Sequence, residues 1–290
     1  HHPSILQFIG CTLNDFENHP NPVIITEYSP NGSLRSILDL QKQLKKISIW
    51  DDTKKLINIY GVASGMSYLH SCDIVHGELN TQNILMDDFL CPKINNFYNT
   101  KINLTRLTNR GKITATRTAK ANDVYSFSLV MYEILTNETP VQGEKLIIRD
   151  ESIPKCYQKL INECSLKDSY KRPTFDSIVE LLRTDSHFIM ESIEKVDFND
   201  YVKFSYDYLK TVNSTKQIIQ LKDFVSPTSS TYIEVNVDQL INQKYLRFRR
   251  KITFPEDVFD LLEADCQHLI RQADSGDSEK QFLLGKMLFE

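Results

Sequence analysis

The chain has 290 residues, of which 41% are hydrophobic and 25% charged, and its formal net charge is -4 at pH 7. This length suits one large globular domain with a smaller second element, and the slightly acidic balance argues against nucleic-acid and anionic-membrane partners. Six scattered cysteines without C-x-x-C pairs argue against a zinc site or a disulfide framework and favour a reducing cytoplasm. No apolar run approaches the roughly 20 residues that span a bilayer.

Two short strands are predicted near the start of the chain, in SILQFIGCTL (4–13) and PVIITEYS (22–29). The apolar period becomes helical after Ser33, which has the side chain of a helix N-cap. The clearest helix is predicted over residues 51–71. A hairpin should follow, because short apolar runs at residues 84–86 and 92–94 flank a polar turn.

A stretch rich in threonine and asparagine, residues 99–122, is predicted to be a polar loop. The next segment, DVYSFSLVMYEILT (123–136), is apolar nearly all round, which is typical of a central, buried helix. Two further helices are predicted over residues 153–165 and 174–185. Residues 185–255 are expected to form a helical linker, and residues 256–290 a helix pair.

Five ordered segments carry a family resemblance: HPSILQFIG, ITEYSPNGSL, GMSYLHSCDIVHGELNTQNILMD, DVYSFSLVMYEILT and CSLKDSYKRPTF. In this order, residues 1–184 resemble a protein kinase of the tyrosine-kinase-like group. The resemblance implies an α+β class: a truncated protein-kinase-like fold with a mostly helical C-lobe and remnant N-lobe strands. The ending ADSGDSEKQFLLGKMLFE is similar to a Sel1-type repeat, a relative of tetratricopeptide repeats. We expect more repeats beyond Glu290.

The resemblance assigns catalysis to HGELNTQN (76–83), where kinases read H-R-D-L-K-x-x-N. Glu78 stands at the base position and is one methylene longer than aspartate; a displacement of about 1 Å can cost roughly 100-fold in rate. Asn80 replaces the lysine that meets the transferred phosphate. Asn83 matches a metal ligand, although an asparagine can equally stabilise a turn. We expect these positions to be inactive.

The metal-binding turn D-F-G of kinases becomes Asn96, Phe97 and Tyr98 in this chain. A neutral amide at Asn96 removes the main anionic ligand for magnesium, so Asn83 and Asn96 together should be weak metal ligands at best. No glycine-rich loop and no strand lysine precede Ile5, and an incomplete N-lobe is therefore expected. No cofactor is expected, whereas ATP and magnesium would be needed by a residual kinase.

By the same resemblance Thr26 would be the gatekeeper, residues 27–29 (Glu27 to Ser29) the adenine-facing hinge and Leu85 the floor of the adenine pocket. The alternative is that all of these are strand and core residues with no ligand. Phe8, His76 and Phe97 match an internal apolar column of kinases.

Two charged residues match structural positions of the family. Asp123 matches the buried aspartate that holds the catalytic-loop backbone. Arg172 matches an arginine that pairs with the glutamate of an A-P-E segment, and this segment is missing between residues 96 and 123. Arg172 should therefore find another partner or stay solvated.

The leading hypothesis is a catalytically impaired, pseudokinase-like scaffold or regulatory protein in the cytoplasm. It would bind other proteins through its kinase-like surface and its helical repeats. The alternative is a residual ATP-dependent protein serine/threonine kinase that uses Glu78 as the base. A third hypothesis treats the kinase-like part as an inert spacer and gives all binding to the repeats.

Overall fold

The computed structural model describes residues 2–12, 19–20, 23–44, 50–96, 109–141 and 144–214. The predicted repeat at 256–290, and the predicted linker after Ser214, lie outside these residues. Phe97 and Tyr98 of the predicted metal turn also lie outside them. Within the described residues the chain is mostly helical, with two small antiparallel sheets.

The first sheet pairs β1 (Phe8–Thr12) with β2 (Val23–Thr26), as predicted, although both strands are shorter than expected. In the described part of the chain this sheet has two strands, and it leaves large apolar side chains in solvent. Phe8 is 47% exposed, so its predicted place in a buried column is wrong. The described residues provide no second layer to cover the β1–β2 ribbon.

Helices α1 (Leu34–Leu44) and α2 (Asp52–Ser71) begin at capping side chains. Ser33 Oγ accepts a hydrogen bond from the amide of Ser36 at 3.2 Å, which confirms the predicted cap. Asp51 caps α2 in the same way, accepting from Lys54 N at 2.8 Å. Helix α2 is the centre of the fold, because most of its residues are buried on several sides.

The predicted hairpin is present as β3 (Ile84–Met86) and β4 (Pro92–Ile94), in the register Ile84 to Ile94. The N-terminal segment runs beside β4: Leu6 N donates to Ile94 O at 2.9 Å, and Ile94 N donates to Ser4 O at 2.8 Å. The first residues of the chain are therefore fastened to the strand that leads into Asn96.

Helix α3 (Asn109–Thr136) has 28 residues and begins inside the stretch predicted to be a loop. The prediction of a polar loop over residues 99–122 is wrong for residues 109–122. Once the buried half of a helix has formed, each further residue adds one backbone hydrogen bond. The alanines between the threonines have high helix propensity and lower the free-energy cost of extending the helix. Lys120 ties this half to the end of α2, donating to His70 O at 2.7 Å and pairing with Asp73 at 2.8 Å.

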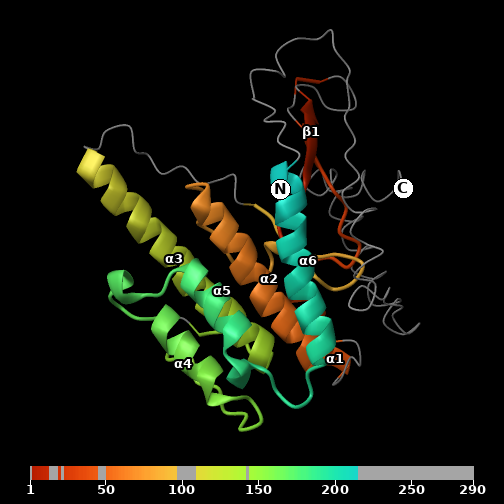
Figure 1. Cartoon of the computed structure of the whole chain (residues 1–290), viewed down its shortest axis with the longest axis vertical. Coiled ribbons are helices and arrows are strands. Elements are labelled where there is room, and N and C mark those ends of the chain that lie inside the picture. The colour runs from red at the N-terminus through yellow and green to blue at the C-terminus, as the bar shows by residue number, and fades with distance from the viewer. Residues whose placement is uncertain are drawn as a thin grey trace. The chain divides into compact units, whose positions relative to one another are not determined.

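Two further helices and two 3₁₀ turns pack around α2 and α3 (Figure 1). They are α4 (Lys155–Cys164), the 3₁₀ turn η3 (Ser169–Lys171), α5 (Phe175–Thr184) and the 3₁₀ turn η4 (Ser186–Phe188). Helix α5 packs on α2, and α4 packs on α3. None of the helices in the described residues combines the length and apolar character needed to cross a bilayer.

Helix α6 (Lys195–Ser214) lies along α2, as Figure 1 shows. The Tyr60 ring meets Phe198 edge-on, with 5.7 Å between ring centroids. Tyr201 is buried, and its hydroxyl makes a 2.9 Å hydrogen bond with Ser4 Oγ. The first part of the predicted linker is thus a helix packed onto the kinase-like core.

Substitution of Gly61, where α2 meets α6, tests this packing. An added Cβ would lie against Tyr201 Oη and 2.6 Å from Pro92 Cγ, so Gly61→Ala should cost about 1 to 3 kcal/mol of unfolding free energy. Tyr201→Phe removes the hydroxyl next to that Cβ. In denaturant unfolding, the double variant should lose less than the sum of the two single losses. Strictly additive losses would contradict the close contact.

Candidate active site

Asp123 of α3 holds the loop that contains the predicted catalytic residues. Its Oδ2 accepts from His76 N and its Oδ1 from Gly77 N, both at 2.8 Å, and its side chain is 1% exposed. His70 Nε2 lies 2.9 Å from the same Oδ2. The predicted role of Asp123 is confirmed. Gly77 has φ +80°, a left-handed conformation that strongly favours glycine, at the point where the loop turns over this carboxylate.

His76 is fully buried beneath the loop. Its Nδ1 accepts a hydrogen bond from Glu78 N at 3.2 Å, so the neutral ring carries its proton on Nε2. Burial lowers the pKa of His76, against the opposing field of Asp123. The neutral His76 ring therefore stabilises the loop by accepting the hydrogen bond from Glu78 N.

The side chain of Glu78 is exposed, and its contacts in the described structure are made by its backbone. Its carbonyl oxygen accepts from Asn83 Nδ2 at 2.8 Å and from Asn80 Nδ2 at 3.0 Å. Within the described part of the chain no side chain holds the Glu78 carboxylate. A base that is solvated and unrestrained lacks the fixed geometry that proton transfer requires.

Asn80 stabilises the loop at the position where kinases carry a lysine. Its Oδ1 accepts from Gln82 N at 2.9 Å and from Asn83 N at 3.0 Å, the pattern of an asparagine that closes a turn. Its side chain is neutral and engaged with its own loop. It leaves no positive charge for a transferred phosphate.

Asn83 and Asn96, the two predicted metal ligands, are hydrogen-bonded to each other. Asn83 donates its Nδ2 to the Glu78 carbonyl, which fixes its Oδ1 on the other side. There that oxygen accepts from Asn96 Nδ2 at 2.9 Å. Asn96 adopts φ +65°, which asparagine tolerates better than most residues.

This pair does not fit a magnesium ion. Magnesium in phosphotransfer sites is held by one or two carboxylates, and here one amide oxygen already accepts a hydrogen bond from the other amide. No cluster of three or more His, Cys, Asp and Glu side chains suited to a metal occurs in the described part of the chain.

The predicted adenine residues lie near one another. Ser33, after the hinge, bridges to Leu85 of β3, and Lys93 of β4 pairs with the Glu27 carboxylate at 3.0 Å. The same carboxylate accepts from Gln7 N at 2.8 Å, so it faces the strands. Thr26 and Ser29 are half-buried. The structure brings hinge and floor together, and the adenine role of these residues stays a prediction.

Arg172 finds another partner, as expected from the missing A-P-E glutamate. Its Nη1 donates to Ala121 O at 2.8 Å and its Nε to Leu166 O at 2.9 Å. The arginine therefore fastens the η3 turn to the part of α3 that was predicted to be a loop.

Sequence reasoning missed a buried polar cluster that supports the loop from the other side. Thr81 Oγ1 donates to Glu133 Oε2 at 3.0 Å, and Arg35 Nη1 lies 3.1 Å from the same oxygen. Burial raises the pKa of Glu133, while Arg35 opposes that shift. A single carboxylate inside the apolar run LVMYEILT was the available signal.

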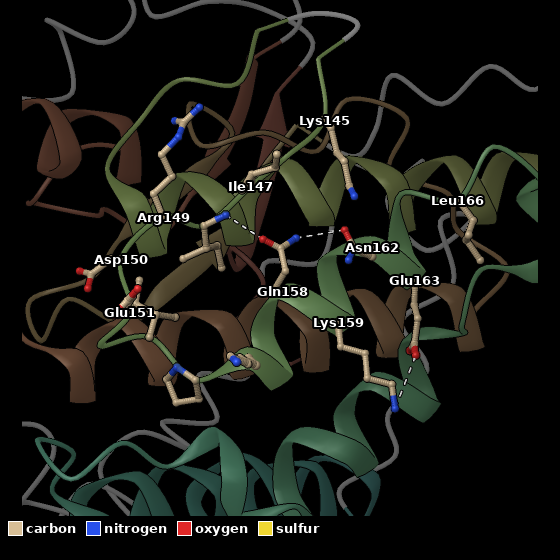
Figure 2. Close-up of a pocket in the computed structure, with 14 residues that line it drawn as sticks. Lys145, Ile147, Arg149, Asp150, Glu151, Gln158, Lys159, Asn162, Glu163 and Leu166 are labelled. Atoms are coloured by element: carbon tan, nitrogen blue, oxygen red, sulfur yellow. Dashed lines mark hydrogen bonds and ion pairs between the residues drawn. The ribbon is translucent and has the colours of Figure 1, made fainter.

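An open pocket of about 900 Å³ lies elsewhere, between α4 and the chain leading into it (Figure 2). Gln158 shapes it by accepting from Ile148 N at 2.7 Å and donating to Leu146 O at 2.9 Å. None of the predicted catalytic, metal or adenine residues lines this pocket.

The buried His76 predicts a pH dependence of stability. The pKa of His76 is lowered in the folded state, so at about pH 6 the unfolded chain binds a proton at this histidine that the folded chain does not bind. Stability therefore falls as the pH drops below about 6.5. His76→Asn keeps an acceptor near the place of Nδ1 and cannot titrate. Between about pH 7.5 and about pH 5.5, its melting temperature should change less than that of the wild type. Burial also lowers the pKa of His2, to about 3, but both proteins share that contribution. Equal changes would contradict the prediction.

Comparison with known proteins agrees with this architecture. A family model described as protein tyrosine and serine/threonine kinase matches residues 1–182. The dual specificity protein kinase pyk3 of Dictyostelium discoideum is 31% identical over 216 residues, covering 66% of this chain and 15% of pyk3. The probable serine/threonine-protein kinase drkC of the same organism is 31% identical over 211 residues, covering 62% of this chain and 27% of drkC.

A plant relative gives the same result. Serine/threonine-protein kinase STY17 of Arabidopsis thaliana is 30% identical over 211 residues, covering 62% of this chain and 34% of STY17. The match thus spans between 15% and 34% of the length of these three relatives. The matched family includes both tyrosine and serine/threonine kinases, which agrees with the tyrosine-kinase-like resemblance. On the family match, the loop held by Asp123 and the helical large lobe, the chain belongs to the protein tyrosine and serine/threonine kinase family.

Proposed function

We propose that this chain is a catalytically impaired, pseudokinase-like member of its family that acts as a scaffold or regulatory protein. The observation that carries the proposal is the hydrogen bond between Asn83 and Asn96. It joins two neutral amides at the place where the resemblance puts a metal-binding carboxylate and its asparagine partner.

The chemistry of phosphoryl transfer supports this proposal. Such enzymes work by positioning and by neutralising charge around the phosphates. Here Asn80 and Asn96 are neutral and occupied within the loop, and the Glu78 carboxylate is solvated. General-base catalysis alone contributes about 10² to 10⁴-fold, so the combined losses should leave very little turnover.

The long helix α3 supports the proposal independently. Kinases place an activation loop between the D-F-G turn and the A-P-E segment. In this chain α3 begins at Asn109, soon after Asn96, and Arg172 is engaged with the helix backbone at Ala121. Part of the segment that would carry activation control is therefore helix.

The alternative is a residual protein serine/threonine kinase with Glu78 as base and with ATP and magnesium as cofactors. The relatives, which are named as serine/threonine and dual specificity kinases, favour it. The ordered loop and the accessible Glu78 also favour it. The amide pair and the neutral Asn80 oppose it.

We further propose that binding to other proteins uses the kinase-like surface and the expected repeats after residue 255. A cytoplasmic location belongs to this proposal and rests on the scattered cysteine pattern. The helix α6, which packs on α2, would connect the two binding parts.

A phosphotransfer assay tests the proposal. The full-length protein, incubated with labelled ATP, magnesium and general protein substrates, should show no more turnover than its Glu78→Ala variant. Glu191→Ala, which removes an exposed carboxylate far along the sequence, is the matched control. Turnover that survives in the control and disappears in Glu78→Ala would establish the residual kinase instead.

A further inference from the structure

Two arginines and two tyrosines form an exposed patch on α3 and η3. Arg117 Cζ lies 4.8 Å from the ring centroid of Tyr170, and Arg172 Cζ lies 5.2 Å from that of Tyr125. Tyr125 is 40% exposed, Tyr170 49% and the neighbouring Leu166 39%. We call these five residues the arginine–tyrosine patch.

The patch is held in place by backbone contacts. Arg172 donates to the carbonyl oxygens of Leu166 and Ala121, which joins the α4–η3 connection to α3. Asp168 caps the η3 turn by accepting from Tyr170 N at 3.1 Å. The Arg172 side chain and the backbone of the η3 turn, fixed in this way, lose little further freedom when a partner binds, which favours affinity.

Positive charge on the patch is poorly compensated. In the described part of the chain Arg117 and Lys167 make no ion pair, and the hydrogen bonds of Arg172 go to carbonyl and amide oxygens. Among the described residues, Asp168 is the carboxylate nearest to these groups: it lies 3.8 Å from the Lys171 ammonium, and its charge also acts on Arg172. The sequence leading into the patch cannot supply the missing carboxylates, because residues 97–122 contain no acidic residue. They contain six basic ones: Lys101, Arg106, Arg110, Lys112, Arg117 and Lys120.

The apolar part of the patch continues into the neighbouring pocket. Leu166 lines the pocket of about 900 Å³, as does Ile147, which is 46% exposed (Figure 2). Arginine and tyrosine are the residue types enriched where proteins bind proteins, and a guanidinium stacked on an aromatic ring still offers its edge to a carboxylate. The surface therefore combines apolar area with positive charge that is compensated only in part. Asp168 lies at the patch, and Asp150, Glu151 and Glu163 line the pocket.

We propose that the arginine–tyrosine patch docks an acidic segment of a partner protein, rich in aspartate and glutamate and carrying a large apolar side chain. Charge complementarity selects this occupant, because carboxylates would pair with Arg117 and Arg172 while the apolar side chain packs against Tyr170 and Leu166. This inference rests on the proposed binding role and names its surface and the chemistry of its partner.

Fluorescence anisotropy with the full-length protein tests the patch. The probe is a short labelled peptide of glutamate and aspartate with one phenylalanine. It should bind at low salt and more weakly at high salt. Arg117→Glu and Tyr170→Ala should each weaken binding by about tenfold or more. Lys203→Glu, the same charge reversal at an exposed lysine of α6, should leave binding unchanged.

Three results would overturn the inference. They are no binding of the peptide, equal weakening by Lys203→Glu, and tighter binding of a single-stranded RNA of similar length, which would make the patch a nucleic-acid site. Melting temperatures of the variants show that each is folded, and both patch substitutions change exposed side chains. The peptide result is independent of turnover. An active kinase in the phosphotransfer assay would overturn the proposed function and leave the docking inference intact. An inactive protein that does not bind the peptide would overturn the docking inference alone.

Discussion

The carboxylate of Asp123 is the contact on which the loop of this protein depends. It accepts two backbone hydrogen bonds, from His76 and Gly77, in a site closed to solvent. Hydrogen bonds to a buried charged group are worth about 1.5 to 3 kcal/mol each, more than an average neutral bond. Since the aspartate belongs to the central helix α3, these bonds attach the loop backbone directly to the core.

The remainder of the loop follows from that anchor. With its backbone fixed, the asparagine side chains bond within the site: Asn80 caps the turn, and Asn83 joins the Glu78 carbonyl to Asn96. These bonds stabilise the loop, and one of them occupies Asn83 Oδ1, the atom that the resemblance assigns to a metal. The shape of the loop is thus kept by the Asp123 carboxylate and by amide hydrogen bonds. At positions 80 and 96, where the resemblance puts a lysine and an aspartate, this chain has neutral amides.

Local patterns predicted the elements whose side chains cap or pair within a short stretch. The cap at Ser33 and the hairpin of β3 and β4 depend on neighbours in sequence, and the hairpin has the predicted bounds. The failures depend on distant packing. A polar composition suggested a loop where the core-anchored α3 continues as helix, and the family position of Phe8 said nothing about what covers it.

The site was predictable in composition but not in its bonding. Asn80 and Asn96 indicated lost charge from the sequence alone. Their bonding could not be read from it, because the pairing of Asn96 with Asn83 requires the β3–β4 hairpin to bring together residues 13 positions apart. The cluster of Arg35, Thr81 and Glu133 likewise joins three separate elements.

The proposal that Asn83 and Asn96 bind no magnesium is tested most directly by the thermal stability of the full-length protein with ATP. A ligand that binds only the folded state raises the melting temperature, by an amount that grows with the logarithm of its concentration relative to Kd. We expect magnesium, added in place of EDTA, to leave the effect of ATP on the melting temperature unchanged in the wild type. Asn96→Asp, which restores a carboxylate, should introduce a magnesium-dependent increase. A magnesium-dependent increase in the wild type, lost in Asn96→Ala, would contradict the proposal.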